Sequence, residues 1–165
     1  SSSLDRKPSN VTGASQAILI GTGLAKIIQK KVFKSYLEIG CQSDVNFSKI
    51  IIDNKIGVDP QSGGTHRMTS DQFFATNNNK YDLIFIDGLH VYEQVKKDIK
   101  NSLQCLNDSG IILIHDCLPR KLWYQTPKRM SFTWNGDVWK ALVEFRTKPN
   151  LEDQEETGYD PYEFA

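Results

Sequence analysis

Short apolar runs separated by polar segments recur along the chain and predict β-strands. The two clearest are residues 81–87 and 111–115, where hydrophobic residues follow one another almost without alternation. Such runs are typical of parallel strands that are covered on both faces. Shorter strands are predicted at residues 35–40 and 55–59, which end at a glycine and before a proline. Residues 66–69 are predicted as a further, weak strand.

Apolar residues between these runs recur every three or four positions, which is the spacing of an amphipathic helix. The clearest predicted helix follows residues 81–87 and carries on one face Tyr92, Val95, Ile99, Leu103 and Leu106. Other helices are predicted over about residues 14–33, from Asp44 to Asn54, from Ser70 to Phe74, and after Asp137. The predicted N-caps are Asp44, Ser70 and Asp137, because their side-chain oxygens can accept hydrogen bonds from free backbone amides.

The alternation of strands and helices from Ser35 to Asp116 predicts an α/β fold. We expect a doubly wound, Rossmann-like sheet that is mainly parallel and has helices on both faces. The predicted domain spans residues 35–146, between an N-terminal helical segment, 1–34, and an acidic tail, 147–165. Such sheets bind ligands at the carboxyl ends of their strands, so the residues that follow each strand are the candidates for function.

Composition narrows the classes of function. Hydrophobic residues make up 39% of the chain, charged residues make up 24%, and the formal net charge is zero. These values predict an ordinary globular protein with no nucleic-acid or membrane partner. The longest apolar runs are too short to cross a bilayer, and the polar residues 1–10 contain no apolar signal core. We therefore expect a cytoplasmic protein, whose three cysteines form no CxxC pair and are reduced thiols.

A glycine and two acids at the ends of the first two strands suggest an adenosine-containing ligand. Gly40 lets the backbone approach a ligand closely, and Asp59, 21 positions after Glu38, can accept both hydroxyls of a ribose. Only Gly40 is present where dinucleotide-binding proteins have three glycines, so a ligand without pyrophosphate is favoured. The alternative is that Asp59 is a turn residue before Pro60.

Four titratable side chains follow the two most hydrophobic strands. Asp87 ends one strand and His90 comes three positions later, while His115 and Asp116 follow the other strand. If the two strands are neighbours, Asp87 and Asp116 can converge on a hard divalent cation, with His115 as a third ligand. A neutral His90 can take a proton from a substrate hydroxyl. The alternatives are that Asp116 binds the loop before Pro119 and that His90 caps its helix or lines the pocket.

Six stretches of the chain form a combination that is more specific than any one of them. They are 36–40 (YLEIG), 56–60 (IGVDP), 69–74 (TSDQFF), 81–90 (YDLIFIDGLH), 112–119 (ILIHDCLP) and 136–141 (GDVWKA). Together they resemble class I S-adenosylmethionine-dependent methyltransferases, and more narrowly the methyltransferase-24 type domain. The similarity covers about residues 35–146, which is most of the chain.

The resemblance implies that S-adenosylmethionine is the cofactor. Its methionine part would lie by Glu38 and Gly40, its ribose at Asp59, its adenine near Ser70 and Asp71, and its methyl group by Asp87.

The resemblance also implies that His90 and Asp87 are the catalytic residues. Some sugar O-methyltransferases of similar layout hold Mg²⁺ with the aspartate that ends their fourth strand and with an acidic pair after their fifth strand. They carry a histidine three positions past that first aspartate as the base. Asp87, His90 and Asp116 match this layout, whereas His115 stands where an acid is expected. The expected metal ligands are therefore Asp87, Asp116 and His115.

Methyl transfer to a hydroxyl oxygen of a small molecule or sugar is the function that the resemblance implies, and a homo-oligomer is compatible with it. The complete fold ends with an antiparallel hairpin, for which no pair of strands is found after Arg146. Two other functions fit the residues. One is a non-catalytic module that binds S-adenosylmethionine, which the reduced glycine loop would suit. The other is a nicotinamide-dependent oxidoreductase, which the missing GxGxxG motif disfavours.

Overall fold

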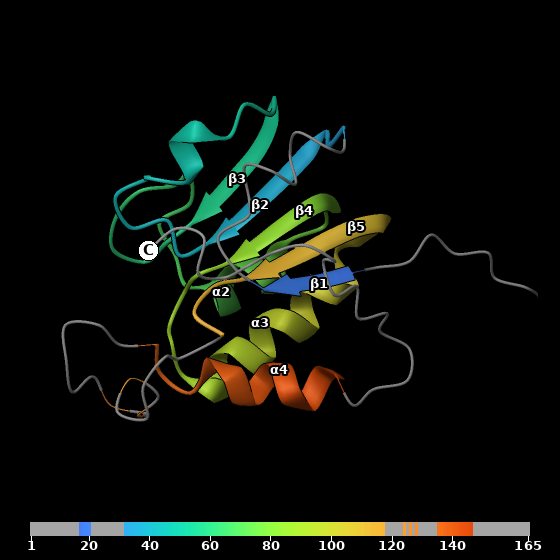
Figure 1. Cartoon of the computed structure of the whole chain (residues 1–165). Coiled ribbons are helices and arrows are strands. Elements are labelled where there is room, and N and C mark those ends of the chain that lie inside the picture. The colour runs from blue at the N-terminus through green and yellow to red at the C-terminus, as the bar shows by residue number, and fades with distance from the viewer. Residues whose placement is uncertain are drawn as a thin grey trace, which may run out of the picture.

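Five parallel strands form one sheet, in the order β1-β5-β4-β2-β3 (Figure 1). The computed structural model describes residues 17–20, 32–117, 124, 126, 128 and 135–146. The strands are β1 (Ala17–Ile20), β2 (Ser35–Ile39), β3 (Asn54–Val58), β4 (Tyr81–Ile86) and β5 (Leu106–Ile114). Every pair of neighbours is parallel, which confirms the predicted Rossmann-like α/β sheet.

The direction in which the chain adds strands reverses between β2 and β4. From β2 the chain passes outward to β3 and then returns to β4 on the other side of β2. Ile39 of β2 pairs with both Val58 of β3 and Ile86 of β4, so these three strands end at the same level. The next residues along the chain are Gly40, Asp59 and Asp87. This edge is a topological switch point, which is where open α/β sheets bind their ligands.

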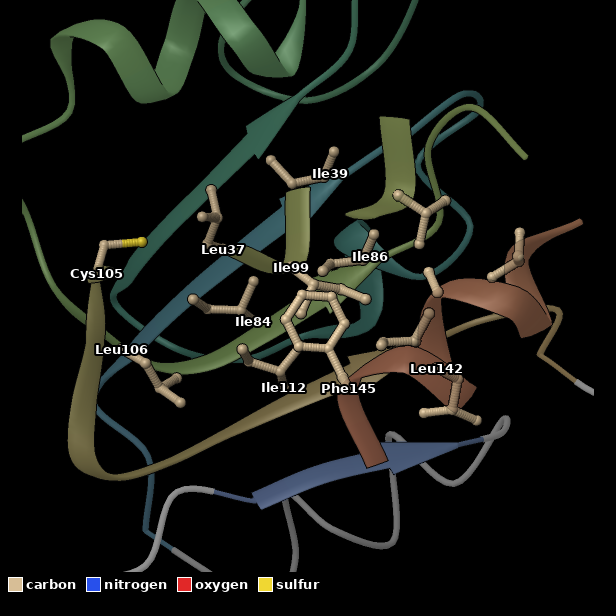
Figure 2. Packing of buried hydrophobic residues seen from close by; sticks show 14 of the residues in the cluster. Leu37, Ile39, Ile84, Ile86, Ile99, Cys105, Leu106, Ile112, Leu142 and Phe145 are labelled. Atoms are coloured by element: carbon tan, nitrogen blue, oxygen red, sulfur yellow. The ribbon is translucent and has the colours of Figure 1, made fainter. Parts of the chain in front are cut away.

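Helices were predicted on both faces of the sheet, whereas the α-helices in the described part of the chain pack on one face. They are α2 (Ser70–Thr76), α3 (Tyr92–Gln104) and α4 (Val138–Arg146). Figure 2 shows this core, in which Ile99 of α3 and Phe145 of α4 meet central-strand residues such as Ile84 and Ile112. Burial of these apolar side chains is the main stabilising contribution to the fold. No helix in the described ranges is both long enough and apolar enough to cross a membrane.

The predicted helix over residues 14–33 is wrong where the structure describes it. Ala17–Ile20 is β1, an edge strand that pairs in parallel with β5 from Ala17 opposite Ile111 to Ile20 opposite Ile114. The reason is tertiary, because β5 offers a row of unpaired backbone groups to a segment rich in β-branched residues. Gly21 and Gly23 also weaken a continuous helix. Residues 32–34 have no regular structure. The rest of the predicted helix and the tail, 147–165, lie outside the described residues.

The predicted helix between Asp44 and Asn54 shrinks to one turn of 3-10 helix, η1 (Phe47–Lys49). Asp44 has a left-handed backbone, with φ of 61°, and its Oδ1 accepts a hydrogen bond from the Gly64 amide at 2.6 Å. Phe47 packs on the face of the sheet opposite to α3 and α4, as part of a second apolar cluster. Ile51, which a continuous helix would place on the same face as Phe47, is 95% exposed. The Asp44 side chain therefore binds the Gly64 amide of a loop instead of capping a helix.

Three smaller boundaries also differ from the prediction. The N-cap of α2 is Thr69 rather than Ser70, because Thr69 and Gln72 form a reciprocal capping box. Leu106 begins β5 rather than continuing α3. The weak strand predicted at residues 66–69 is a single parallel bridge between Val58 and His66.

Asp137 directly precedes α4, as predicted, but its carboxylate serves a different helix. Oδ1 of Asp137 accepts a hydrogen bond of 2.7 Å from the amide of Tyr92, the first residue of α3. Oδ2 accepts a hydrogen bond from Nζ of Lys140 at 3.2 Å. The side chain therefore ties the start of α4 to the start of α3, close to the loop that follows β4.

Candidate active site

The loops that follow β2 and β4 touch at the carboxyl edge of the sheet. Gly40 has φ of 90°, and a Cβ at this position would lie 2.2 Å from the backbone oxygen of Asp87. The Asp87 amide donates to the oxygen of Ile39 at 2.8 Å, and the Gly40 amide donates to the oxygen of Val58 at 2.8 Å. Only glycine fits position 40, and the neighbour that excludes a side chain is the chain's own backbone.

Asp87, His90, His115 and Asp116 come together next to this contact, because β4 and β5 are parallel neighbours. Nε2 of His90 lies 3.3 Å from Oδ1 of Asp87, and Nδ1 of His90 lies 3.4 Å from Oδ2 of Asp116. Nδ1 of His115 lies 3.1 Å from Oδ1 of Asp87 and 3.4 Å from Oδ1 of Asp116. The four side chains are 20% to 30% exposed, so a ligand can reach them.

The carboxylates and imidazoles of this cluster change each other's protonation. Burial raises the pKa of Asp87, but His115 and His90 lower it by more, so the pKa lies below its usual value. Asp116 and Asp87 raise the pKa of His115 to about 10, against the effect of burial. Nδ1 of His115 nevertheless has no hydrogen bond of good geometry to a described residue. The contacts of His115 with the two carboxylates therefore favour its imidazolium form at neutral pH.

Glu38, predicted to border the methionine part of the cofactor, is the most buried acid at this edge of the sheet. It is 1% exposed and accepts a hydrogen bond from the Tyr36 hydroxyl at 2.5 Å. Burial raises the pKa of Glu38 to about 7, and the charges of Asp87 and Asp44 add to the rise. Glu38 is thus close to the midpoint of its titration at neutral pH.

Asp59, predicted to hold the ribose, organises its own loop. Its Oδ1 accepts hydrogen bonds from the amides of Gln61 and Ser62, both at 2.8 Å, and its Oδ2 accepts one from the Gln42 amide at 2.9 Å. Burial raises the pKa of Asp59, but these amides lower it by more, so the group is a carboxylate. A carboxylate oxygen can accept two hydrogen bonds, so Oδ2 keeps one position for a ligand hydroxyl.

Ser70 and Asp71, predicted to lie near the adenine, stand at the start of α2 and contact α3. Nε2 of Gln94 donates to Oγ of Ser70 at 3.1 Å and to Oδ1 of Asp71 at 3.0 Å. Asp71 also pairs with Nζ of Lys97 at 3.4 Å. The structure thus groups Glu38, Gly40, Asp59 and Asp87 at the ends of neighbouring strands and places Ser70 and Asp71 at the α2–α3 contact.

Asn135 is a residue of this site that the sequence did not single out. Its Nδ2 donates a hydrogen bond to Oδ1 of Asp116 at 2.9 Å, across 19 positions of sequence. Gly136, the next residue, has φ of 62° and lies against the backbone oxygen of His90. The only signal in the sequence is the Asn-Gly pair, which is a turn signal and says nothing about what the turn contacts.

A metal ion could be held by one group of three side chains within the described residues. The group is Asp87, His90 and Asp116, whose ligand atoms lie within 4.8 Å of one another. His115, the expected third ligand, contacts both carboxylates but is not part of this group. The two carboxylates suit Mg²⁺, whereas an imidazole is a better ligand for transition metals. The donor set therefore fits Mg²⁺ only in part.

Comparison with known protein families gives a match. Residues 49–117 match the family model described as Methyltransferase domain. The match runs from the last residue of η1 to three residues past the end of β5 and includes Asp59, Asp87, His90 and Asp116. It confirms the resemblance predicted from the sequence. Comparisons with curated proteins and with solved structures found no match to this chain.

Proposed function

We propose that this chain, which matches a methyltransferase domain over residues 49–117, is a class I S-adenosylmethionine-dependent methyltransferase that transfers the cofactor's methyl group to a hydroxyl oxygen of a small molecule or sugar. The observation that carries the proposal is the position of His90. Its ring lies between the carboxylates of Asp87 and Asp116, at the carboxyl edge of the sheet, where open α/β sheets bind their ligands. A histidine held in this way can accept the proton that a hydroxyl loses on methylation.

The cofactor supplies a methyl group on a sulfonium, which an acceptor oxygen displaces in line to leave S-adenosylhomocysteine. The chain's residues then have two tasks, namely alignment and proton transfer. His90 takes the hydroxyl proton on one ring nitrogen while a carboxylate orients the other nitrogen. Both of its contacts, at 3.3 Å and 3.4 Å, are long for hydrogen bonds, so either one can give way to a substrate hydroxyl.

The residues at the strand ends fit a cofactor that carries positive charge. Glu38, Asp59 and Asp87 present three carboxyl groups at one edge of the sheet, and Asp59 keeps an acceptor position for a ribose hydroxyl. Ser70 and Asp71 would form the side of the site nearest the adenine. A divalent cation, where one binds, would be held by Asp87 and Asp116 and would make the acceptor hydroxyl more acidic. Because the donor set fits Mg²⁺ only in part, the proposed reaction has no step through a metal.

Cofactor binding is tested by calorimetric titration of the full chain with S-adenosylmethionine and S-adenosylhomocysteine. We expect both to bind, and Asp59→Ala to weaken binding by at least about tenfold, because the ribose acceptor and its loop are lost. The matched control is Asp53→Ala, at an exposed aspartate before the amino end of β3, which should leave binding unchanged. Binding of a nicotinamide cofactor in place of these ligands would favour the oxidoreductase.

Catalysis is tested by transfer of a labelled methyl group to a panel of sugars and other hydroxyl compounds. We expect His90→Ala to lower kcat by about 100-fold or more without weakening cofactor binding, because only the proton acceptor is removed. His66→Ala is the matched control, since the His66 ring contacts Phe73 and Thr65, away from the acid–histidine cluster. Cofactor binding without transfer to any acceptor would favour a non-catalytic module.

A further inference from the structure

We propose that Asn135 is a positioning residue that holds Asp116, and through it His90, in the geometry needed for proton transfer. The proposal rests on the proposed function, because it assumes that His90 is the proton acceptor. Neither the matched family segment, which ends at residue 117, nor the residues expected from the sequence include Asn135.

Asp116 is supported from outside its own loop. Its backbone has φ of 57°, in the left-handed region that is uncommon for residues with a side chain, although aspartate adopts it more readily than most. Asn135 donates to Oδ1 of Asp116 at 2.9 Å, while Oδ2 lies 3.4 Å from Nδ1 of His90. The amide group of Asn135 thus decides which carboxylate oxygen faces His90.

A second donor competes for the same oxygen. Nδ1 of His115 lies 3.4 Å from Oδ1 of Asp116, farther than the amide of Asn135. Without that amide, the carboxylate is free to turn toward the imidazole of His115. Such a rotation draws Oδ2 away from His90 and leaves Asp87 as the carboxylate in this cluster that still orients the His90 ring.

Asn135 is itself firmly placed. The backbone amide of Asn135 donates to the backbone oxygen of Tyr124 at 2.9 Å, and the backbone amide of Gly136 donates to the same oxygen at 3.1 Å. A Cβ at Gly136 would lie 1.7 Å from the backbone oxygen of His90, so this turn rests directly on the His90 loop. Asp137, the third residue in the row, caps α3 two residues beyond His90. Residues 135–137 therefore contact both loops that carry the site: the loop after β5 at Asp116, and the loop after β4 at His90 and Tyr92.

The first test reads the histidine rings directly. The chain has three histidines, and long-range ¹⁵N–¹H spectra of the cofactor-free full chain at a fixed pH report the hydrogen bonding of each ring. Asn135→Ala should shift the signals of His90 and leave those of His66 in place. Asn135→Asp keeps the shape of the side chain but has no N–H donor and adds a negative charge, so it should shift the His90 signals at least as far.

Asn107→Ala is the matched control. Nδ2 of Asn107 donates to Oδ1 of Asp82 at 2.7 Å, so the variant removes the same kind of asparagine–aspartate hydrogen bond near the amino end of β4. Both alanine variants should lose a similar amount of thermal stability. Only Asn135→Ala should shift the His90 signals. It should also lower kcat by about 10-fold to 100-fold, with KM for S-adenosylmethionine unchanged.

Two results would overturn the proposal. One is a folded Asn135→Ala or Asn135→Asp protein whose His90 signals match those of the wild type. The other is a His90 shift in Asn135→Ala with kcat equal to that of Asn107→Ala. If the wild-type chain binds no S-adenosylmethionine or transfers no methyl group, the proposed function fails, while the histidine spectra still decide whether Asn135 positions His90.

Discussion

Replacement of Gly40 with alanine is expected to lower the free energy of unfolding by about 3 to 5 kcal/mol and to abolish cofactor binding. The new Cβ would lie 2.2 Å from the oxygen and 2.5 Å from the carbonyl carbon of Asp87. Both are backbone atoms, so no side-chain rotation relieves the clash, and the ends of β2 and β4 must move apart. The φ of 90° adds strain, because residues with a Cβ rarely adopt it.

Gly88→Ala is the matched control, because Gly88 lies across the same contact. A Cβ on Gly88 would lie 3.3 Å from Cγ2 of Ile39, a methyl group that can shift, and 3.9 Å from its next neighbours. We expect its free energy of unfolding to change by less than about 1 kcal/mol. Urea unfolding measures the stability of both variants, and calorimetry measures cofactor binding. Equal stability of Gly40→Ala and Gly88→Ala would contradict the close approach of the two loops.

The central sheet could be predicted from the sequence because its signals are strong and local. The unbroken apolar run of β4 and the three-and-four spacing of α3 each allow one interpretation. Because parallel strands end at one edge of the sheet, the acids and histidines at the ends of β4 and β5 are then expected to lie close together. For this reason Asp87, His90, His115 and Asp116 could be grouped in advance.

The parts that could not be predicted depend on partners distant in sequence. Ala17–Ile20 is a strand because β5 has an open edge, which the segment itself does not reveal. Asp44 was expected to cap a helix, but the Gly64 amide, 20 positions away, takes its carboxylate. Asn135 and Asp116 are 19 positions apart, and Asp137, two residues after Asn135, binds the start of α3. In each case a tertiary contact outweighs the local preference.

Glu38→Gln is expected to raise the free energy of unfolding at pH 8 by about 3 kcal/mol relative to the wild type. Burial raises the pKa of Glu38 from its ordinary 4.5 to about 7 in the folded chain. The wild type must therefore ionise a buried acid at pH 8, whereas glutamine stays neutral. The Tyr36 hydroxyl, which donates to Glu38 at 2.5 Å, can donate to the amide oxygen of glutamine instead.

The pH range of this effect follows from the two pKa values. Below pH 4.5 the group is protonated in both folded and unfolded chains, so ionisation of Glu38 costs nothing. Between pH 4.5 and about 7 the folded chain holds more protons than the unfolded chain, so the stability of the wild type falls as pH rises. Above about pH 7 the loss is complete. The difference between variant and wild type should thus grow over this range and then level off.

Asp98→Asn gives a control with a different range. Asp98 is 1% exposed, and burial raises its pKa from 3.8 to about 6. The free energy of unfolding that Asp98→Asn gains over the wild type should therefore reach its full value about one pH unit lower than that of Glu38→Gln. Urea unfolding at pH 4.5, 6, 7 and 8, without cofactor, separates the two variants. A Glu38→Gln protein no more stable than the wild type at pH 8 would show that Glu38 ionises in the fold at little cost. The same variant should bind S-adenosylmethionine more weakly at pH 8, because the family resemblance implies that Glu38 borders the methionine part of the cofactor, which carries positive charge.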